Sequence, residues 1–131
     1  MSYWQNYSQL EQAFILLSIY QFKHFICDFP LQRPYMLNKI RDGWDFVFPL
    51  SLHCFVHAIF TFILVIAVRP DLWWLGFVDF AIHFVMDRLK AGKNYLGRYR
   101  DKTKAAYWNS LGFDQMIHHI THIYIVWVMV H

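Results

Sequence analysis

The sequence predicts an all-α fold, a bundle of four transmembrane helices. Of its 131 residues, 57% are hydrophobic and 21% aromatic, but only 16% are charged, whereas about a quarter are charged in a typical soluble domain. Four apolar segments are each close to the ~20 residues that a helix needs to cross the hydrocarbon core. They cover residues 10–27, 46–68, 72–90 and 111–130. The chain is too short for a second core, so we expect a single domain, residues 1–131.

The boundaries of these segments follow from turn and breaker residues. Pro30 and Pro34 end the first helix, and the stretch "VRPD" at residues 68–71 makes a tight turn between the second and third. Residues 91–110 form a basic loop before the fourth helix. Aromatic and leucine side chains alternate with the charges of this loop, so part of it could form an amphipathic helix at the membrane surface.

The basic residues predict the orientation in the membrane. Three follow the first helix, one lies between the second and third, and seven lie at or after the end of the third. In that order they are Arg33, Lys39, Arg41; Arg69; and Arg88, Lys90, Lys93, Arg98, Arg100, Lys102, Lys104. The positive-inside rule makes the first and third loops cytoplasmic and puts both termini outside. We therefore expect a multi-pass membrane protein, with lipids as partners. Anionic headgroups explain the basic loop, so we expect no nucleic acid partner.

Each predicted helix carries histidine and aspartate residues spaced four apart, which share one helix face. The four sets are His24 and Asp28; His53 and His57; Asp79, His83 and Asp87; and Asp114, His118 and His122. Alternating helix directions bring these stripes to the same cytoplasmic part of the bundle. Asp79 and His122 lie about one turn deeper, where they orient other ligands or pair with each other. His119 and His131 lie off the stripes.

A shared metal ion explains four converging stripes better than isolated packing does. A single membrane histidine is usually a hydrogen-bonded packing residue, and charges near helix ends often extend to water. However, intramembrane ionisable groups cost at least ~2.5 kcal/mol each at mid-bilayer. Neutral imidazoles and carboxylates are ligands of first-row metals, so we expect zinc, with manganese or iron as alternatives. The predicted ligands are His24, Asp28, His53, His57, His83, Asp87, Asp114, His118 and His122, which exceed one tetrahedral site and imply one or two ions.

The motifs also resemble those of a known family. "HFICDFPLQ" supplies a His-x-x-x-Asp-Phe-x-x-Gln pattern, and "DQMIH" supplies a closing Asp-Gln-x-x-His. With the paired histidines of the second helix and the His-x-x-x-Asp of the third, this resembles a family of small bacterial and phage four-helix membrane proteins, a domain of unknown function. The stretch "HCFVHA" is also distantly similar to proteins labelled membrane-bound metal-dependent hydrolases. The first likeness implies the bacterial inner membrane as the location, and the second implies hydrolysis as an expected activity.

The first functional hypothesis is a metal-dependent hydrolase at the cytoplasmic membrane face. A bound ion would activate water, and Asp87 or Asp114 would act as general base. Gln32 and Gln115 would contact substrate or orient a ligand, unless they only cap polar groups. Basic side chains near the headgroup region favour a lipid-derived or amphiphilic phosphoester as substrate.

Two other classes of function fit the same residues. Carboxylate and histidine chains in membranes also serve as ion relays, so the protein could carry a divalent metal or couple metal movement to protons. The outward halves of the helices are apolar and offer no exit, so such a path would require a homo-oligomer. Alternatively, the metal only stabilises the bundle of a membrane effector that binds a partner protein.

Overall fold

A computed structural model describes residues 3–131 as an all-α protein, with no β-strand among those residues. The helices are α1 (Gln9–Asp28), α2 (Val47–Val68), α3 (Leu75–Ala91) and α4 (Ala105–Val130). Short 3-10 segments flank or connect them: η1 (Trp4–Asn6), η2 (Pro34–Ile40), η3 (Pro70–Leu72) and η4 (Leu96–Arg98). The predicted all-α class is confirmed.

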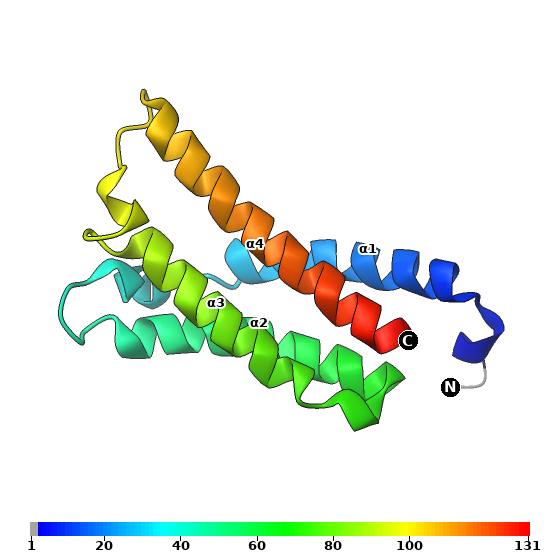
Figure 1. The fold of residues 1–131 in the computed structure, drawn as a ribbon. Coiled ribbons are helices and arrows are strands. Elements are labelled where there is room, and N and C mark those ends of the chain that lie inside the picture. The colour runs from blue at the N-terminus through cyan, green and yellow to red at the C-terminus, as the bar shows by residue number, and fades with distance from the viewer. Residues whose placement is uncertain (1–2) are drawn as a thin grey trace.

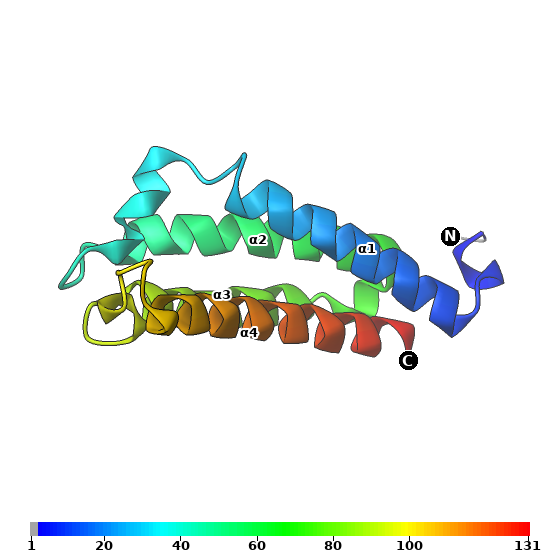
Figure 2. The same cartoon turned by 90° about the horizontal axis from the view of Figure 1, so that it is seen from above.

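The four α-helices form two layers (Figures 1 and 2). α1 and α2 lie in one layer and α3 and α4 in the other, as the view from above shows. Contacts between α2 and α3 and between α1 and α4 join the layers. The connections 29–46 and 92–104 lie at one end of the bundle, called here the loop end. The α2–α3 turn and the C-terminus lie at the opposite end, called here the terminal end.

Local sequence signals explain several helix boundaries. α1 begins with a capping box, in which Ser8 N donates to the Glu11 carboxylate over 2.8 Å and the Ser8 hydroxyl accepts from Glu11 N over 3.3 Å. α1 ends at Asp28, shortly before Pro30, whose ring is incompatible with a helix interior. Pro49 is tolerated in the first turn of α2, where its missing N–H has no helical acceptor.

Two boundaries differ from the sequence prediction. α4 begins at Ala105 rather than at residue 111, so its first turns occupy part of the expected loop 91–110. The reason is that Ala105 and Ala106 are strong helix formers, whereas the prediction followed only the apolar run. α3 begins at Leu75 rather than at residue 72, because Pro70–Leu72 forms a 3-10 turn. Between the end of α3 and the start of α4, residues 92–104 contain one helical segment, the short η4.

The interior of the bundle has two parts. At the terminal end, apolar side chains pack into a core formed by Leu16, Tyr20, Val65, Leu75, Ile125, Val126, Met129 and Val130. Toward the loop end, histidines, aspartates and a lysine are buried as well, beside apolar residues such as Leu50, Cys54 and Met86. The helices therefore meet around hydrocarbon at one end and around ionisable groups at the other.

Length and composition identify one described helix, α2, as able to cross a membrane. A core helix of a soluble protein can meet the same criteria, so length and composition do not support the expected multi-pass arrangement. α3 has only 17 residues, and α1 and α4 carry the ionisable side chains that lower their hydropathy. The ionisable residues that predict a metal site thus also lower the hydropathy by which a transmembrane helix is recognised.

Candidate metal centre

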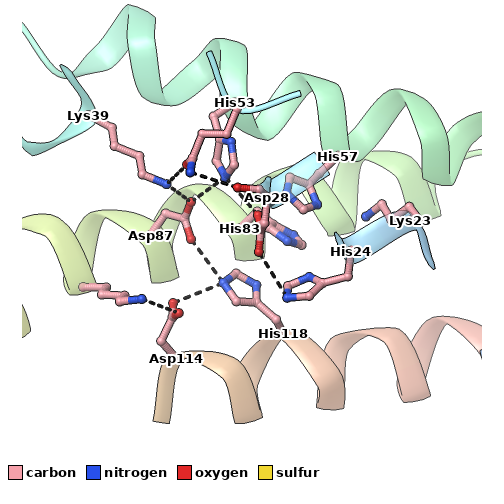
Figure 3. A network of polar contacts seen from close by, with 12 residues as sticks. Lys23, His24, Asp28, Lys39, His53, His57, His83, Asp87, Asp114 and His118 are labelled. Atoms are coloured by element: carbon pink, nitrogen blue, oxygen red, sulfur yellow. Dashed lines mark hydrogen bonds and ion pairs between the residues drawn. The ribbon is translucent and has the colours of Figure 1, made fainter. Parts of the chain in front are cut away.

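All four helices contribute to one buried cluster of histidines and aspartates (Figure 3). α1 brings two of the predicted ligands from its last two turns, and α2 brings two from its first half. α3 and α4 bring the others from the faces that look into the bundle. The nine predicted ligands are all buried except Asp28, which is partly exposed. Eight of them form three groups of three that could each hold an ion, with His24 belonging to two groups. The ninth, His53, lies between two of the groups.

The first group lies at the bottom of an open pocket and consists of Asp87, Asp114 and His118. His118 Nε2 lies 3.1 Å from Asp87 Oδ1 and 3.2 Å from Asp114 Oδ1. One ligand atom from each of the three residues lies within 4.8 Å of the others. We call this group the pocket-floor site. It offers two carboxylates and one imidazole, a set that first-row divalent ions accept.

The second group consists of His24, Asp28 and His57. His57 Nε2 is 2.8 Å from Asp28 Oδ1, and His24 Nε2 is 3.1 Å from Asp28 Oδ2. His53 Nε2 connects this group to the first, because it lies 3.5 Å from Asp28 Oδ1 and 3.1 Å from Asp87 Oδ2. The cluster is therefore continuous from α1 through α2 to α3 and α4.

The third group lies deeper and consists of His24, His83 and His122. An aspartate and a lysine that are not among the predicted ligands also lie beside it. Asp79 Oδ1 lies 2.8 Å from His83 Nδ1, and Lys23 Nζ donates to Asp79 Oδ2 over 2.8 Å. Asp79 and His122 do not pair with each other; His122 instead stacks on the Tyr20 ring with centroids 4.9 Å apart. His119, expected to be off the cluster, belongs to none of the three groups, although its ring centroid is 5.5 Å from that of His24.

Three lysines were missed by the sequence reasoning and neutralise three of the carboxylates. Lys23 pairs with Asp79, Lys39 Nζ with Asp87 over 3.1 Å, and Lys90 Nζ with Asp114 over 3.1 Å. A signal for Lys23 does exist in the sequence. It shares the spacing of the buried α1 residues Leu16, Tyr20 and Cys27, so its side chain faces the bundle.

An open pocket of about 620 Å³ leads from the loop end to the pocket-floor site. Gln32 and Gln115, which were predicted to contact substrate or ligands, both line it. Gln115 Nε2 donates to Asp114 over 3.0 Å, and its Oε1 lies 3.1 Å from His24 Nε2. Gln32 Oε1 accepts from Lys39 over 3.0 Å. Both amides therefore contact residues of the cluster without any ligand being bound.

The segment 34–46 closes one side of the cluster and is fastened to α3. The Arg88 guanidinium lies 3.6 Å from the centre of the Phe46 ring and donates to the Arg41 carbonyl over 3.1 Å. Lys93 donates to Asp42 over 2.8 Å, and this hydrogen bond lowers the pKa of the Asp42 carboxyl. These contacts hold Lys39 over Asp87.

Unpartnered imidazole nitrogens indicate that the cluster fits a metal ion. Buried polar atoms in folded proteins nearly always have a hydrogen-bond partner. Among residues 3–131, the buried nitrogens without one are His24 Nδ1, His53 Nδ1, His57 Nδ1, His83 Nε2, His118 Nδ1 and both ring nitrogens of His122. Neutral imidazole nitrogen is a preferred ligand of zinc and other first-row ions. The protein therefore has buried histidine and aspartate groups that could bind a metal.

These features define a class: an all-α bundle with a buried, metal-compatible histidine–aspartate cluster between its helices. The chain belongs to the DUF3307 family, described as a protein of unknown function, whose model matches residues 14–131. This agrees with the resemblance found in its motifs; the additional likeness to hydrolases finds no support in this match. No curated protein and no solved structure matches the chain.

Proposed function

We propose that this protein is a membrane-embedded, metal-dependent hydrolase that acts on an anionic, amphiphilic phosphoester at the loop end. One observation carries the proposal. The pocket-floor site, with its three metal-compatible side chains, lies at the base of an open pocket that Lys39, Lys90 and Arg100 also line. Possible metal ligands and basic side chains in one open pocket suit a negatively charged substrate better than a purely structural site.

The outer surface of the bundle supports insertion of all four helices. Large apolar side chains point outward from each helix while the ionisable ones point inward. Examples more than half exposed are Phe14, Phe22, Phe55, Ile63, Phe77, Val85, Ile120 and Trp127. A soluble monomer rarely exposes a continuous apolar surface of this kind. The 17 residues of α3 are at the short end of the range that spans a bilayer.

The proposed chemistry divides between the ion and the chain. A divalent ion, zinc in preference to manganese or iron, would supply an activated water and polarise the phosphoryl group. Whichever of Asp87 and Asp114 is not bound to the ion would accept a proton as general base. Lys39 and Lys90 would pair with phosphate oxygens, and Gln115 would hold Asp114 in position. Apolar residues of the same pocket, among them Phe29, Ile40 and Leu111, would face the substrate's hydrocarbon portion.

The test is hydrolysis by the purified full chain in detergent. A short-chain phosphatidic acid and p-nitrophenyl phosphate would be supplied with zinc, manganese or iron after chelator treatment. We expect metal-dependent phosphate release that Asp114→Asn and His118→Ala lower at least ten-fold. Asp71→Asn is the matched control, since Asp71 is exposed in the α2–α3 turn, and should keep full activity. Equal rates with and without metal, or in all variants, would refute the proposal.

The proposed topology has a separate test. A single cysteine introduced at Asn94 should be protected from a membrane-impermeant thiol reagent in intact cells. A cysteine added after His131 should react. The reverse pattern would overturn the orientation with cytoplasmic basic loops.

Metal transport is a second candidate, because the imidazoles continue inward from the pocket. The ring centroid of His83 lies 4.2 Å from those of both His118 and His57, in the manner of a relay. Against it, the apolar core closes the terminal end, where Leu16, Val65 and Ile125 are fully buried. Zinc uptake into proteoliposomes, together with no hydrolysis of the substrates above, would favour transport.

A further inference from the structure

We propose that the chain contains a second metal site, distinct from the pocket floor, in which His24, His83 and His122 bind zinc through imidazole nitrogen alone. The three side chains come from α1, α3 and α4, and one nitrogen of each lies within 4.8 Å of the others. Relative exposure is 8%, 1% and 0% for the three residues in that order. We call this the deep site. It does not depend on the proposed hydrolysis.

His83 is already oriented as a ligand. Its Nδ1 lies 3.2 Å from the Asp79 carbonyl oxygen, to which it hydrogen-bonds, and 2.8 Å from Asp79 Oδ1. Both oxygens are acceptors, so Nδ1 carries the proton and Nε2 keeps its lone pair. His83 Nε2 has no hydrogen-bond partner within the described chain. Metal-bound histidines usually donate their second ring N–H to a carboxylate or carbonyl in this way.

Asp79 is itself fixed by two other helices. Lys23 Nζ on α1 donates to it over 2.8 Å, and the Thr61 hydroxyl on α2 also donates to it. Asp79 is fully buried. A carboxylate held in this way serves to orient His83, because its charge is already balanced by Lys23. Asp79 is thus a positioning residue of the deep site.

Metal binding would explain why a histidine is buried at position 122. Its ring is fully buried against Tyr20, and neither ring nitrogen has a hydrogen-bond partner in residues 3–131. Packing alone would be served as well by phenylalanine, without two unpartnered polar atoms. A metal ion would satisfy one of these nitrogens and would explain a histidine at this buried position of α4.

The two sites differ in chemistry and share no residue. The pocket-floor site presents two carboxylates and one imidazole, whereas the deep site presents three imidazoles. Oxygen ligands accept manganese, and imidazole ligands favour zinc and copper. We therefore infer that manganese competes with zinc at the pocket floor and competes poorly at the deep site.

Zinc counting on the full chain tests this inference. Metal-free protein in detergent would be saturated with zinc, freed of excess by gel filtration and analysed by mass spectrometry. We expect two ions for the parent, one for His122→Phe, and one for the Asp114→Asn/His118→Ala double variant. His119→Phe is the matched control, from the same stretch of α4, and should bind two. A manganese excess should remove one zinc from the parent and none from the double variant.

Two further measurements keep the result decisive. Because His122 makes no hydrogen bond in the described chain, His122→Phe should retain the parent's melting temperature without zinc and gain less from zinc. X-ray absorption of the single-zinc double variant should show three imidazoles. If His122→Phe still binds two zinc ions, or if the remaining ion has mainly carboxylate ligands, the deep site is wrong. Two zinc ions without any hydrolysis would reject the proposed enzyme and leave the deep site standing.

Discussion

The loop end and the terminal end of the bundle hold the same four helices together by different forces. At the terminal end, Leu16, Val65, Leu75 and Ile125 are fully buried in an apolar core. Such packing is non-directional and tolerates changes that conserve volume. At the loop end, every buried carboxylate needs a specific lysine or histidine, and an unpartnered group is costly. The difference teaches that apolar packing holds one end together, whereas matched ionic and hydrogen-bond partners hold the other.

The largest expected effect comes from breaking the Lys23–Asp79 pair where the two ends meet. Asp79→Leu leaves the Lys23 ammonium buried without a counter-charge, so we expect a loss of about 3–5 kcal/mol in the free energy of unfolding. The double variant Lys23→Met/Asp79→Leu should recover most of that loss. Reversible unfolding in detergent would measure both. A double variant as unstable as the single one would show that the charge imbalance is not the cause.

A cavity in the apolar core should have the next largest effect. Leu16→Ala removes a fully buried side chain, and we expect a cost of about 3 kcal/mol. The same unfolding measurement would be made with zinc and with chelator. Because Leu16 is remote from the ligands, the stabilisation by zinc should equal that of the parent. A smaller zinc effect would show that the two ends are not independent.

Replacing single ligand residues tests the loop end of the bundle. His83→Ala, Asp114→Ala and His118→Ala should each lower bound metal and cost about 1–3 kcal/mol through the polar groups left without a partner. His119→Ala and His131→Ala should change neither quantity. Metal content and melting temperature would be measured for all five. Full metal and a parental melting temperature in the first three would contradict the shared cluster.

The smallest effect should come from the exposed pair of Lys93 and Asp42. Both side chains are more than half exposed, so Asp42→Asn should leave the melting temperature at pH 7 unchanged within error. The hydrogen bond from Lys93 lowers the pKa of Asp42. Any contribution of this pair is therefore present above the carboxyl's ordinary pKa and is lost as pH falls through its lowered value. A large change at pH 7 would mean that this contact controls the position of segment 34–46.

The sequence predicted the helices well because the fold depends on long apolar runs. The four-residue spacing also placed histidines and aspartates on inward faces, since helix periodicity fixes the direction of a side chain regardless of its partner. In the structure, nine such residues lie in one cluster. The start of α4 was missed because Ala105 and Ala106 extend the helix without extending the apolar run.

The lysines could not be placed in the same way. Lys39 lies in segment 34–46, whose path depends on contacts such as Arg88 with Phe46. Lys90 is at the end of α3, where a long side chain could equally extend to water. Its pairing with Asp114 depends on the packing of α3 against α4. Spacing in the sequence specifies a face, but only tertiary packing specifies which groups on neighbouring faces meet.

The lysine pairs imply an order of binding. With neutral imidazoles, the cluster contains four carboxylates, Asp28, Asp79, Asp87 and Asp114, and three ammonium groups, Lys23, Lys39 and Lys90. Its formal charge is therefore −1, which attracts a cation and repels a phosphate. One divalent ion reverses the sign to +1. Under the proposed function, the metal would therefore bind before the anionic substrate, because only the metal-loaded cluster would attract a phosphate.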